Sequence, residues 1–243
     1  MLQLWLVEML MVWTERRIVI ARPGATLLTP AVTLGHGPLR VSDDASPGTA
    51  GVDLYWLPLG AGGQSVRVNG RVFEAVVSRL EHRRECDLYH SALEVRVPAG
   101  RFVIEQTPVP DRDGARRGVV AAGAVGTRWL GRFRIFRYEV RRWREGVIPD
   151  IGEAVDSPRR LTADPECAHR LLDLVPSIPT PVWGRNELRA GEMWNSNSVI
   201  SWLIASSGLA PESIHPPDGG RAPGWEAGLI VARRREGAGI PAP

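Results

Sequence analysis

Residues 194–204 read WNSNSVISWLI, a small polar cluster between a tryptophan and an apolar run. The residues that follow the cluster at the i, i+3, i+4, i+7 spacing of one helical face are Val199, Trp202, Leu203 and Ser206. Gly208 suits the position just beyond a helix end. The spacing therefore predicts a helix that begins inside the polar cluster. Whether the cluster only caps this helix or also holds a nucleophile is left open by the sequence.

The composition predicts a folded globular protein. The chain has 243 residues, of which 44% are apolar, so it is long enough to bury a sizeable core. It contains no lysine, and its 30 arginines against 27 acidic residues give a net charge of +3. Such exclusive use of arginine indicates codon bias rather than function.

Arginines gather in the stretch FRIFRYEVRRWR, residues 133–144, and again at 233–235. Arginine pairs with phosphates and stacks on bases, so a nucleic-acid surface is one interpretation. The alternation of Phe133 and Ile135 with arginines also fits a strand that has one charged, solvated face. We favour the strand, and nucleic acid is not the expected partner.

The two cysteines do not predict a disulfide framework. Cys86 and Cys167 lie far apart and form no CxxC pattern, which suits a reducing cytoplasm. With His90 and His169 they supply the residue types of a zinc site, but their spacing departs from the usual ligand patterns. We expect neither a metal nor another cofactor.

The N-terminal stretch MLQLWLVEMLMVW is apolar but is not expected to be a signal peptide or a membrane span. It has no basic residue ahead of it, carries Glu8 and is too short to cross a bilayer. It is interpreted either as an amphipathic helix or as an over-long gene start with Met11 as the true beginning.

Periodicity and turn residues predict one α+β domain over 51–235, after an N-terminal extension (1–50) and before a disordered tail (236–243). We expect a strand at 52–60, a hairpin turn at Asn69-Gly70 and a helix within 74–84. A second hairpin is predicted at 88–97 and 101–107, followed by a loop (110–128), a strand (133–140) and turns (145–164). The remaining predictions are a helix at 165–175, the helix of the opening motif and a last strand at 225–235.

Two fragments resemble the circularly permuted papain-like families, which include the PPPDE peptidases and, more distantly, the lecithin retinol acyltransferase and NlpC-like group. They are DLYHSALEV, which places His90 at the start of a strand, and WNSNSV at the start of a later helix. The resemblance spans roughly 52–206 but is specific only at these two motifs. It implies a permuted papain-like fold in which an antiparallel sheet packs against helices.

The resemblance also implies site residues. His90 matches the base, Asn195 the residue before the nucleophile, and Ser196 stands where the family has cysteine. A serine must lose its proton during attack, so it needs His90 in hydrogen-bond reach and a third group to orient the imidazole. Glu105 and Gln106 are the candidate orienters, and at most one of them can face the site. Ser198 is the second candidate nucleophile.

Two functions from different classes follow. The first is a hydrolase or acyltransferase that cleaves an amide, isopeptide or ester bond, with the amides at the helix start as the oxyanion hole. The second is a catalytically inactive domain of the same fold that binds a peptide or protein partner. The candidate binding residues are Asn195, Asn197, Ser198, Trp194 and Trp183.

Overall fold

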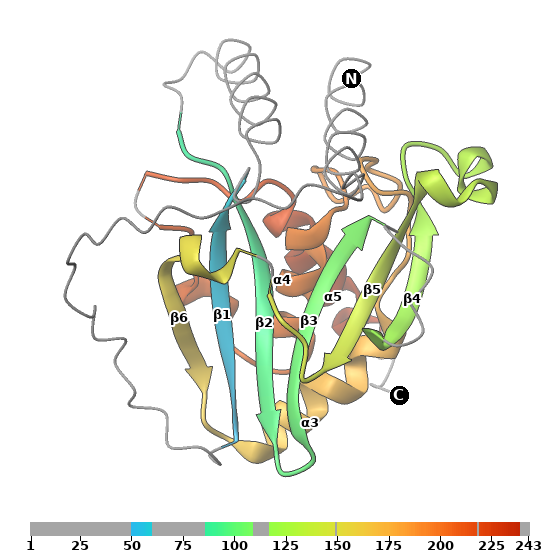
Figure 1. The fold of residues 1–243 in the computed structure, drawn as a ribbon. Coiled ribbons are helices and arrows are strands. Elements are labelled where there is room, and N and C mark those ends of the chain that lie inside the picture. Colours follow the sequence, from blue (N-terminus) through green and yellow to red (C-terminus); the bar gives the residue numbers. More distant parts are fainter. Residues whose placement is uncertain (1–49, 60–85, 109–116, 149, 218, 239–243) are drawn as a thin grey trace, which may run out of the picture.

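The computed structural model describes residues 50–59, 86–108, 117–148, 150–217 and 219–238. Its centre is an antiparallel six-stranded sheet with the strand order β4-β5-β3-β2-β1-β6 (Figure 1). The strands are β1 (Gly51–Pro58), β2 (Tyr89–Val97), β3 (Gly100–Pro108), β4 (Val119–Ala124), β5 (Arg137–Arg144) and β6 (Val155–Thr162). The helices are α3 (Pro165–Leu174), α4 (Ser196–Ser206) and α5 (Trp225–Gly237).

One face of the sheet packs against the three helices, as Figure 1 shows. Side chains of a strand alternate between the two faces, so every second residue of β1 and β2 joins this core. Trp56 lies opposite Ser91 and packs against Trp225 of α5, with ring centroids 5.0 Å apart. Leu93 and Val95 continue the same face of β2 beneath α3 and α4. We call this the helix face.

The opposite face carries a smaller apolar cluster, made by Tyr55, Leu57, Ala92, Val103 and Ile148. His90 lies directly opposite Leu57 in the β1–β2 ladder and therefore belongs to this outer face.

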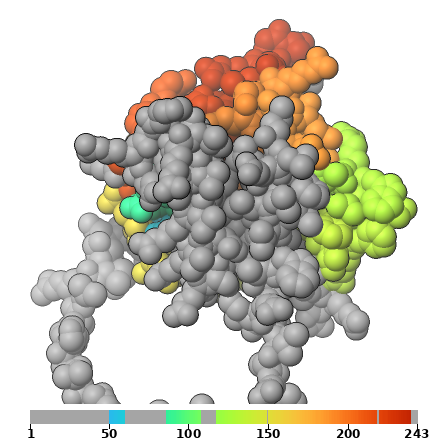
Figure 2. Space-filling view, turned by 90° about the horizontal axis from the view of Figure 1, so that it is seen from above, coloured from blue at the N-terminus to red at the C-terminus, as the bar shows by residue number. Residues whose placement is uncertain are grey.

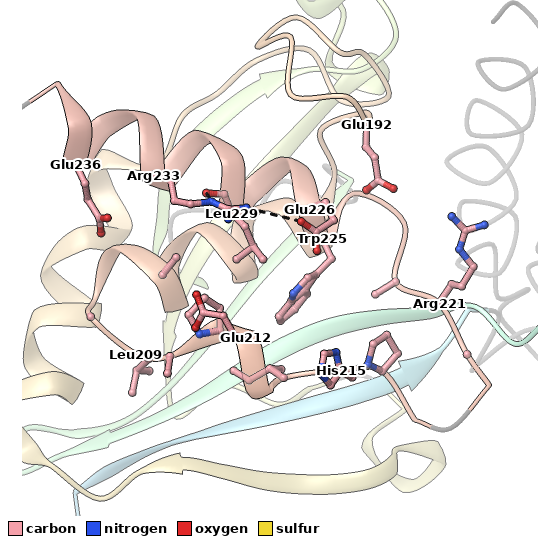
Figure 3. A pocket seen from close by; sticks show the side chains of 18 residues that line it. Glu192, Leu209, Glu212, His215, Arg221, Trp225, Glu226, Leu229, Arg233 and Glu236 are labelled. Atoms are coloured by element: carbon pink, nitrogen blue, oxygen red, sulfur yellow. Dashed lines mark hydrogen bonds and ion pairs between the residues drawn. The ribbon is translucent and has the colours of Figure 1, made fainter.

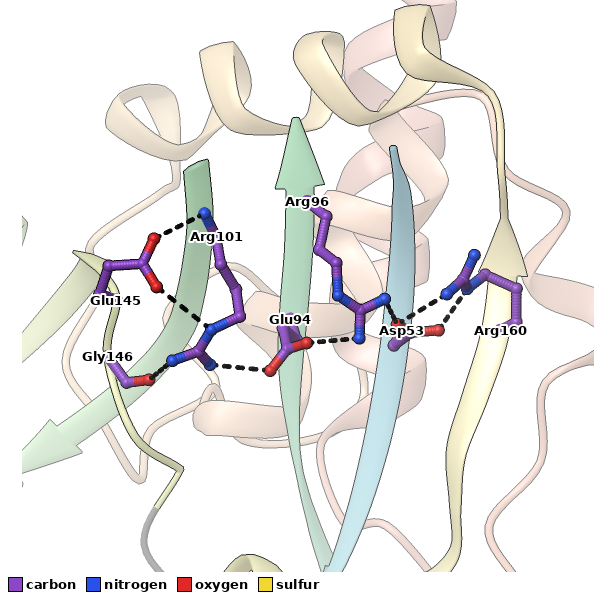
Figure 4. A network of polar contacts seen from close by, with 7 residues as sticks. All are labelled: Asp53, Glu94, Arg96, Arg101, Glu145, Gly146 and Arg160. Atoms are coloured by element: carbon purple, nitrogen blue, oxygen red, sulfur yellow. Dashed lines mark hydrogen bonds and ion pairs between the residues drawn. The ribbon is translucent and has the colours of Figure 1, made fainter. Parts of the chain in front are cut away.

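The outer face also carries a charged network that crosses four strands (Figure 4). Asp53 on β1 is 2% exposed and accepts hydrogen bonds from Arg96 of β2 and Arg160 of β6. Glu94 of β2 accepts from Arg96 at 2.7 Å and from Arg101 of β3 at 2.9 Å. Each buried carboxylate thus has two guanidinium partners, which offsets the cost of removing it from water.

The predicted α+β class and several predicted elements are confirmed. The strand near 52–60 is β1, the hairpin is β2 and β3, and the helices of 165–175 and of the opening motif are α3 and α4. Gly208 follows α4 with a φ of 83°, the left-handed conformation expected after a helix end. The predicted Asn69-Gly70 turn, the 74–84 helix and nearly all of the N-terminal extension lie outside the described residues.

Four assignments were wrong. The segment 225–235 is helix α5 and not a strand, since its Glu, Ala, Leu and Arg content favours a helix, and α5 continues to Gly237. The predicted strand at 133–140 is displaced, because 134–136 form a 3₁₀ turn and β5 runs from 137 to 144. β4 lies within the predicted loop, and β6 within the predicted turns. Both are edge strands, where glycine and proline are tolerated.

Candidate functional site

The polar cluster of the opening motif forms a complete helix cap. Asn195 is the N-cap of α4, and its Oδ1 accepts a hydrogen bond from the backbone N–H of Ser198 at 3.2 Å. In return, Ser198 Oγ accepts from the Asn195 N–H at 3.1 Å. Ser198 Oγ also donates to the carbonyl of Gly224 at 2.7 Å. This capping box fixes where α4 begins and ties it to the segment that leads into α5.

Asn197 attaches the start of α4 to the sheet. Its Nδ2 donates to the carbonyls of Tyr89 and Pro223, each at 3.0 Å, and its Oδ1 accepts from Ser91 Oγ at 2.9 Å. Asn197 is only 2% exposed. The predicted binding residues Asn195, Asn197 and Ser198 therefore act as buried structural contacts.

Ser196 and His90, the predicted dyad, lie on opposite sides of the sheet. Ser196 is the first residue of α4, which packs on the helix face. Ser91 reaches Asn197 on that face, so its neighbour His90 points to the outer face. Burial lowers the pKa of His90 to about 4, which keeps the imidazole neutral at pH 7. The predicted Ser196–His90 dyad is not formed, because strand alternation directs the two side chains apart.

Glu105 and Gln106, the two candidates for orienting His90, lie on opposite faces of the sheet. Glu105 shares the outer face with His90 but pairs with Arg141 at 3.3 Å. Burial raises the pKa of Glu105, and the adjacent Arg141 opposes that rise. Gln106 lies on the helix face, where neither of its amide atoms has a hydrogen-bond partner. Neither residue has a contact with His90 among the residues described here.

The two candidate tryptophans belong to the core. Trp194 is 1% exposed, and its backbone pairs with Arg185 and Gly184. Trp183 packs its edge against Tyr138, with centroids 5.7 Å apart. Trp194 is thus fully buried and Trp183 is partly buried against the core, so a role of either in binding stays a prediction.

The arginine stretch is not a strand with one solvated charged face. Arg141 is 3% exposed and pairs with Glu105 and Glu139, while Arg142 donates to the carbonyl of Leu172. Within the described part of the chain, no group of three or more His, Cys, Asp or Glu residues is arranged to hold a metal ion. Cys86 and Cys167 are not joined by a disulfide, and Cys167 is buried in α3.

A pocket of about 600 Å³ opens between α5 and the segment that follows α4 (Figure 3). We call it the α4–α5 pocket. Trp225 points into it, and Leu229 and Leu209 supply further apolar wall (Figure 3). Ile214 also lines the pocket. Its position is set by Ser201, whose Oγ donates to the carbonyl of Trp225 at 2.7 Å and so fixes the first turn of α5.

The charge around this pocket is predominantly negative. Its lining contains four glutamates, Glu192, Glu212, Glu226 and Glu236, against two arginines, Arg221 and Arg233. Glu192 accepts a hydrogen bond from the Gly224 N–H at 2.8 Å, and Glu226 pairs with Arg233 at 3.9 Å. Glu212 and Glu236 are exposed and have no ion pair within the described residues.

The sequence did not point to a pocket: of its lining, it singled out Gly208 only as a helix end and Arg233 only as part of an arginine cluster. The signal was present, because Trp225, Leu229, Arg233 and Glu236 recur at i, i+4, i+8 and i+11. This spacing marks one face of a helix and carries no meaning for a strand. Because residues 225–235 were assigned to a strand, they were not identified from the sequence as one side of a pocket.

No protein-family model matches the chain, and comparison with curated proteins and with solved structures finds no significant match. No helix within the described segments is both long and apolar enough to cross a bilayer.

Proposed function

We propose that this chain is a non-catalytic binding domain whose α4–α5 pocket takes a basic side chain of a peptide or protein partner. The observation that carries the proposal is an apolar pocket with an indole in its wall and two unpaired carboxylates, Glu212 and Glu236, on its lining. Concave sites that combine apolar walls with a few polar groups are typical of ligand recognition.

The chemistry of the lining favours arginine or lysine as the bound group. Both have an aliphatic stem that can pack against Trp225 and Leu229, and a cationic head that remains hydrated or pairs with a carboxylate. A guanidinium can also form a two-point hydrogen bond with a carboxylate of Glu212 or Glu236. Such a bond adds geometric selectivity to the charge attraction.

A hydrolase is not favoured because the groups it requires are dispersed. Ser196 has its candidate base on the other side of the sheet, and the adjacent polar side chains complete the cap of α4. We propose that the domain is a permuted papain-like fold without a working dyad. This is supported by the contact of Asn197 with the Tyr89 carbonyl, which packs the helix start against the strand that carries His90.

Isothermal titration with N-acetyl-arginine methylamide and with its neutral citrulline counterpart tests the binding proposal. Citrulline keeps the shape of arginine but not the charge, so we expect only the arginine compound to bind. A Glu212→Gln/Glu236→Gln variant should weaken binding by about tenfold, since no carboxylate remains at either position to pair with the guanidinium. The matched control is Glu166→Gln/Asp173→Asn, which removes two exposed carboxylates from α3. Equal binding of both compounds, or equal loss in both variants, would contradict the proposal.

A further inference from the structure

The loop between β4 and β5, residues 125–136, stands out as a lobe at one edge of the sheet (Figures 1 and 2). We call it the β4–β5 tip. It consists largely of two 3₁₀ turns, Trp129–Arg132 and Arg134–Phe136, neither of which contains a buried residue. Trp129 is 61% exposed, Phe133 45% and Ile135 43%. Three large apolar side chains are thus presented to solvent within seven positions of one another.

The charged residues within the apolar tip and the chain beside it are mostly arginines. The sequence from 117 to 138 contains no aspartate or glutamate and five arginines, which are Arg117, Arg128, Arg132, Arg134 and Arg137. Arg128 pairs with Glu187 through two hydrogen bonds of 3.0 Å each. Arg132, Arg134 and Arg137 are exposed, and no carboxylate pairs with them in the segments that the structure describes.

The exposure of these side chains is built into the loop. The Val125 N–H donates to the Phe136 carbonyl at 2.8 Å and closes the neck of the tip. Gly131 lies so close to β4 that a Cβ there would be 2.6 Å from the Cβ of Ala124. The Arg128–Glu187 pair then ties the tip to the segment after α3. The loop is therefore packed onto the domain while its aromatic residues face outward.

We propose that the β4–β5 tip is a peripheral membrane contact for an anionic lipid bilayer. Tryptophan and phenylalanine are favoured at the boundary between headgroups and acyl chains, where Ile135 would also be buried. Arg132, Arg134 and Arg137 lie beside these residues and would meet lipid phosphates at the same depth. This contact is independent of the α4–α5 pocket and does not require a membrane-spanning segment.

The geometry favours a lipid surface over single-stranded nucleic acid. Base stacking needs open aromatic faces. In the tip, the Arg132 guanidinium lies 3.6 Å from the centroid of the Trp129 ring and 4.8 Å from that of Phe133. The two rings meet edge to face at 72°. One guanidinium thus covers a face of both rings, and the exposed Ile135 has no ring on which a base could stack.

Vesicle co-sedimentation of the full chain tests this contact. The probes are vesicles of phosphatidylcholine with and without phosphatidylglycerol, and the variants are Trp129→Gln/Phe133→Gln and Arg134→Gln/Arg137→Gln. We expect binding only to the anionic vesicles, a loss of about tenfold or more in each variant, and weakening by added salt. The control Val147→Gln/Ile151→Gln, which changes two exposed apolar residues elsewhere, should bind as the unmodified protein does.

Every variant retains the apolar N-terminal residues 1–13, so any lipid affinity of that stretch is common to all of them. Equal binding by the tip variants and the unmodified chain would overturn the proposal, as would equal affinity for neutral vesicles. Binding of a single-stranded oligonucleotide that is lost in the tip variants, without lipid binding, would assign the surface to nucleic acid instead. Because the altered side chains are exposed, all variants should keep the unfolding temperature of the parent.

Discussion

Ser196 and Ser198 lie two positions apart at the start of α4 but have different surroundings. Ser198 is fully buried and exchanges hydrogen bonds with Asn195 and Gly224, whereas Ser196 is half-buried at the first helical position. We expect Ser198→Ala to lower the free energy of unfolding by about 1–3 kcal/mol, because it breaks the cap and leaves buried groups unpaired. Ser196→Ala should change it by less than about 0.5 kcal/mol. Urea unfolding measures both, and a larger effect at Ser196 would contradict this account of the cap.

His90 should make the stability of the protein sensitive to acid. The imidazole takes up a proton near pH 6.5 when unfolded, but only near pH 4 in the folded protein, where burial disfavours the charge. The unfolded state therefore binds more protons between these values, and the free energy of unfolding falls as the pH drops from 6.5 to 4. Because His90 is partly exposed, we expect a contribution of about 1–2 kcal/mol.

A His90→Gln variant tests this dependence, since glutamine does not titrate. Urea unfolding at several pH values between 7 and 4 should show a flatter profile for His90→Gln than for the parent. The carboxylates still titrate in both proteins, so the difference between the two curves is the quantity to compare. Parallel curves would show that His90 keeps its ordinary pKa in the folded state.

At the level of single residues, the sequence predicted the helix start but not the face of His90. A small polar cluster before an apolar periodic run indicated a helix start within the cluster, but the sequence did not single out Asn195, because Ser196, Asn197 and Ser198 are also cap-forming types. Strand alternation fixes that His90 and Ser91 point in opposite directions, but it does not state which face α4 covers. That choice depends on the tertiary contacts of Asn197 with Tyr89 and Ser91.

The packing of α4 against α5 depends on the absence of a side chain at Gly228. A Cβ at this position would overlap Ser201 Oγ and the Ser198 carbonyl, and would lie 2.8 Å from the Trp202 nitrogen. Two of these three atoms belong to the backbone of α4, which cannot move aside. We expect Gly228→Ala to lower the free energy of unfolding by about 3 kcal/mol and to disturb the α4–α5 pocket.

Gly237 of the same helix provides the matched control. A Cβ there meets nothing within 4 Å, so Gly237→Ala should be neutral or slightly stabilising through higher helix propensity. Thermal unfolding of the two variants compares them directly. Equal destabilisation at both positions would contradict this account. It would mean that backbone flexibility, and not the close approach of α4 and α5, is the reason for glycine at position 228.

Elements whose ends carry clear sequence signals could be predicted. The two edge strands of the sheet, β4 and β6, could not. α3 has Asp164 as its N-cap and Pro165 in its first turn, and both signals are local. β4 contains small residues, and Gly123 leaves space for the Tyr138 ring of β5. The sequence of such a strand has little alternation of apolar and polar residues. Its strand conformation therefore depends on pairing with the neighbouring strand. β6 is similar, since its pairing with β1 carries two irregularities in register.

Across the whole molecule, the outer-face network joins β6, β1, β2 and β3 into one frame. Asp53 is its most buried carboxylate, between Arg96 and Arg160. Asp53→Asn should lower the free energy of unfolding by about 3 kcal/mol, because both guanidinium groups lose their charged partner in a partly buried site. Arg128→Gln breaks an ion pair whose arginine is largely exposed, and should lower the free energy of unfolding far less than Asp53→Asn does. Urea unfolding of the two variants measures the loss of stability in each. Equal losses would contradict a structural role for the network.

The sequence placed the chain in the α+β class, since this follows from local periodicity and turn residues. It did not locate the pocket or the β4–β5 tip, which arise where distant segments meet. Glu212, which follows α4, joins the α5 residues Trp225 and Glu236 in one pocket lining only after α5 has packed on α4. The sheet thus holds a negatively charged pocket on its helix face and a positively charged tip at its edge.

The most direct test of the central claim is fluorine NMR of protein labelled with 5-fluorotryptophan, titrated with N-acetyl-arginine methylamide. Trp225→Phe assigns the Trp225 resonance, and the fully buried Trp194 serves as an internal reference. The account predicts a saturable shift of the Trp225 resonance with the arginine compound but not with citrulline, and loss of that shift in Glu212→Gln/Glu236→Gln. An unchanged Trp225 resonance at saturating arginine compound would contradict the assignment of this pocket as the binding site.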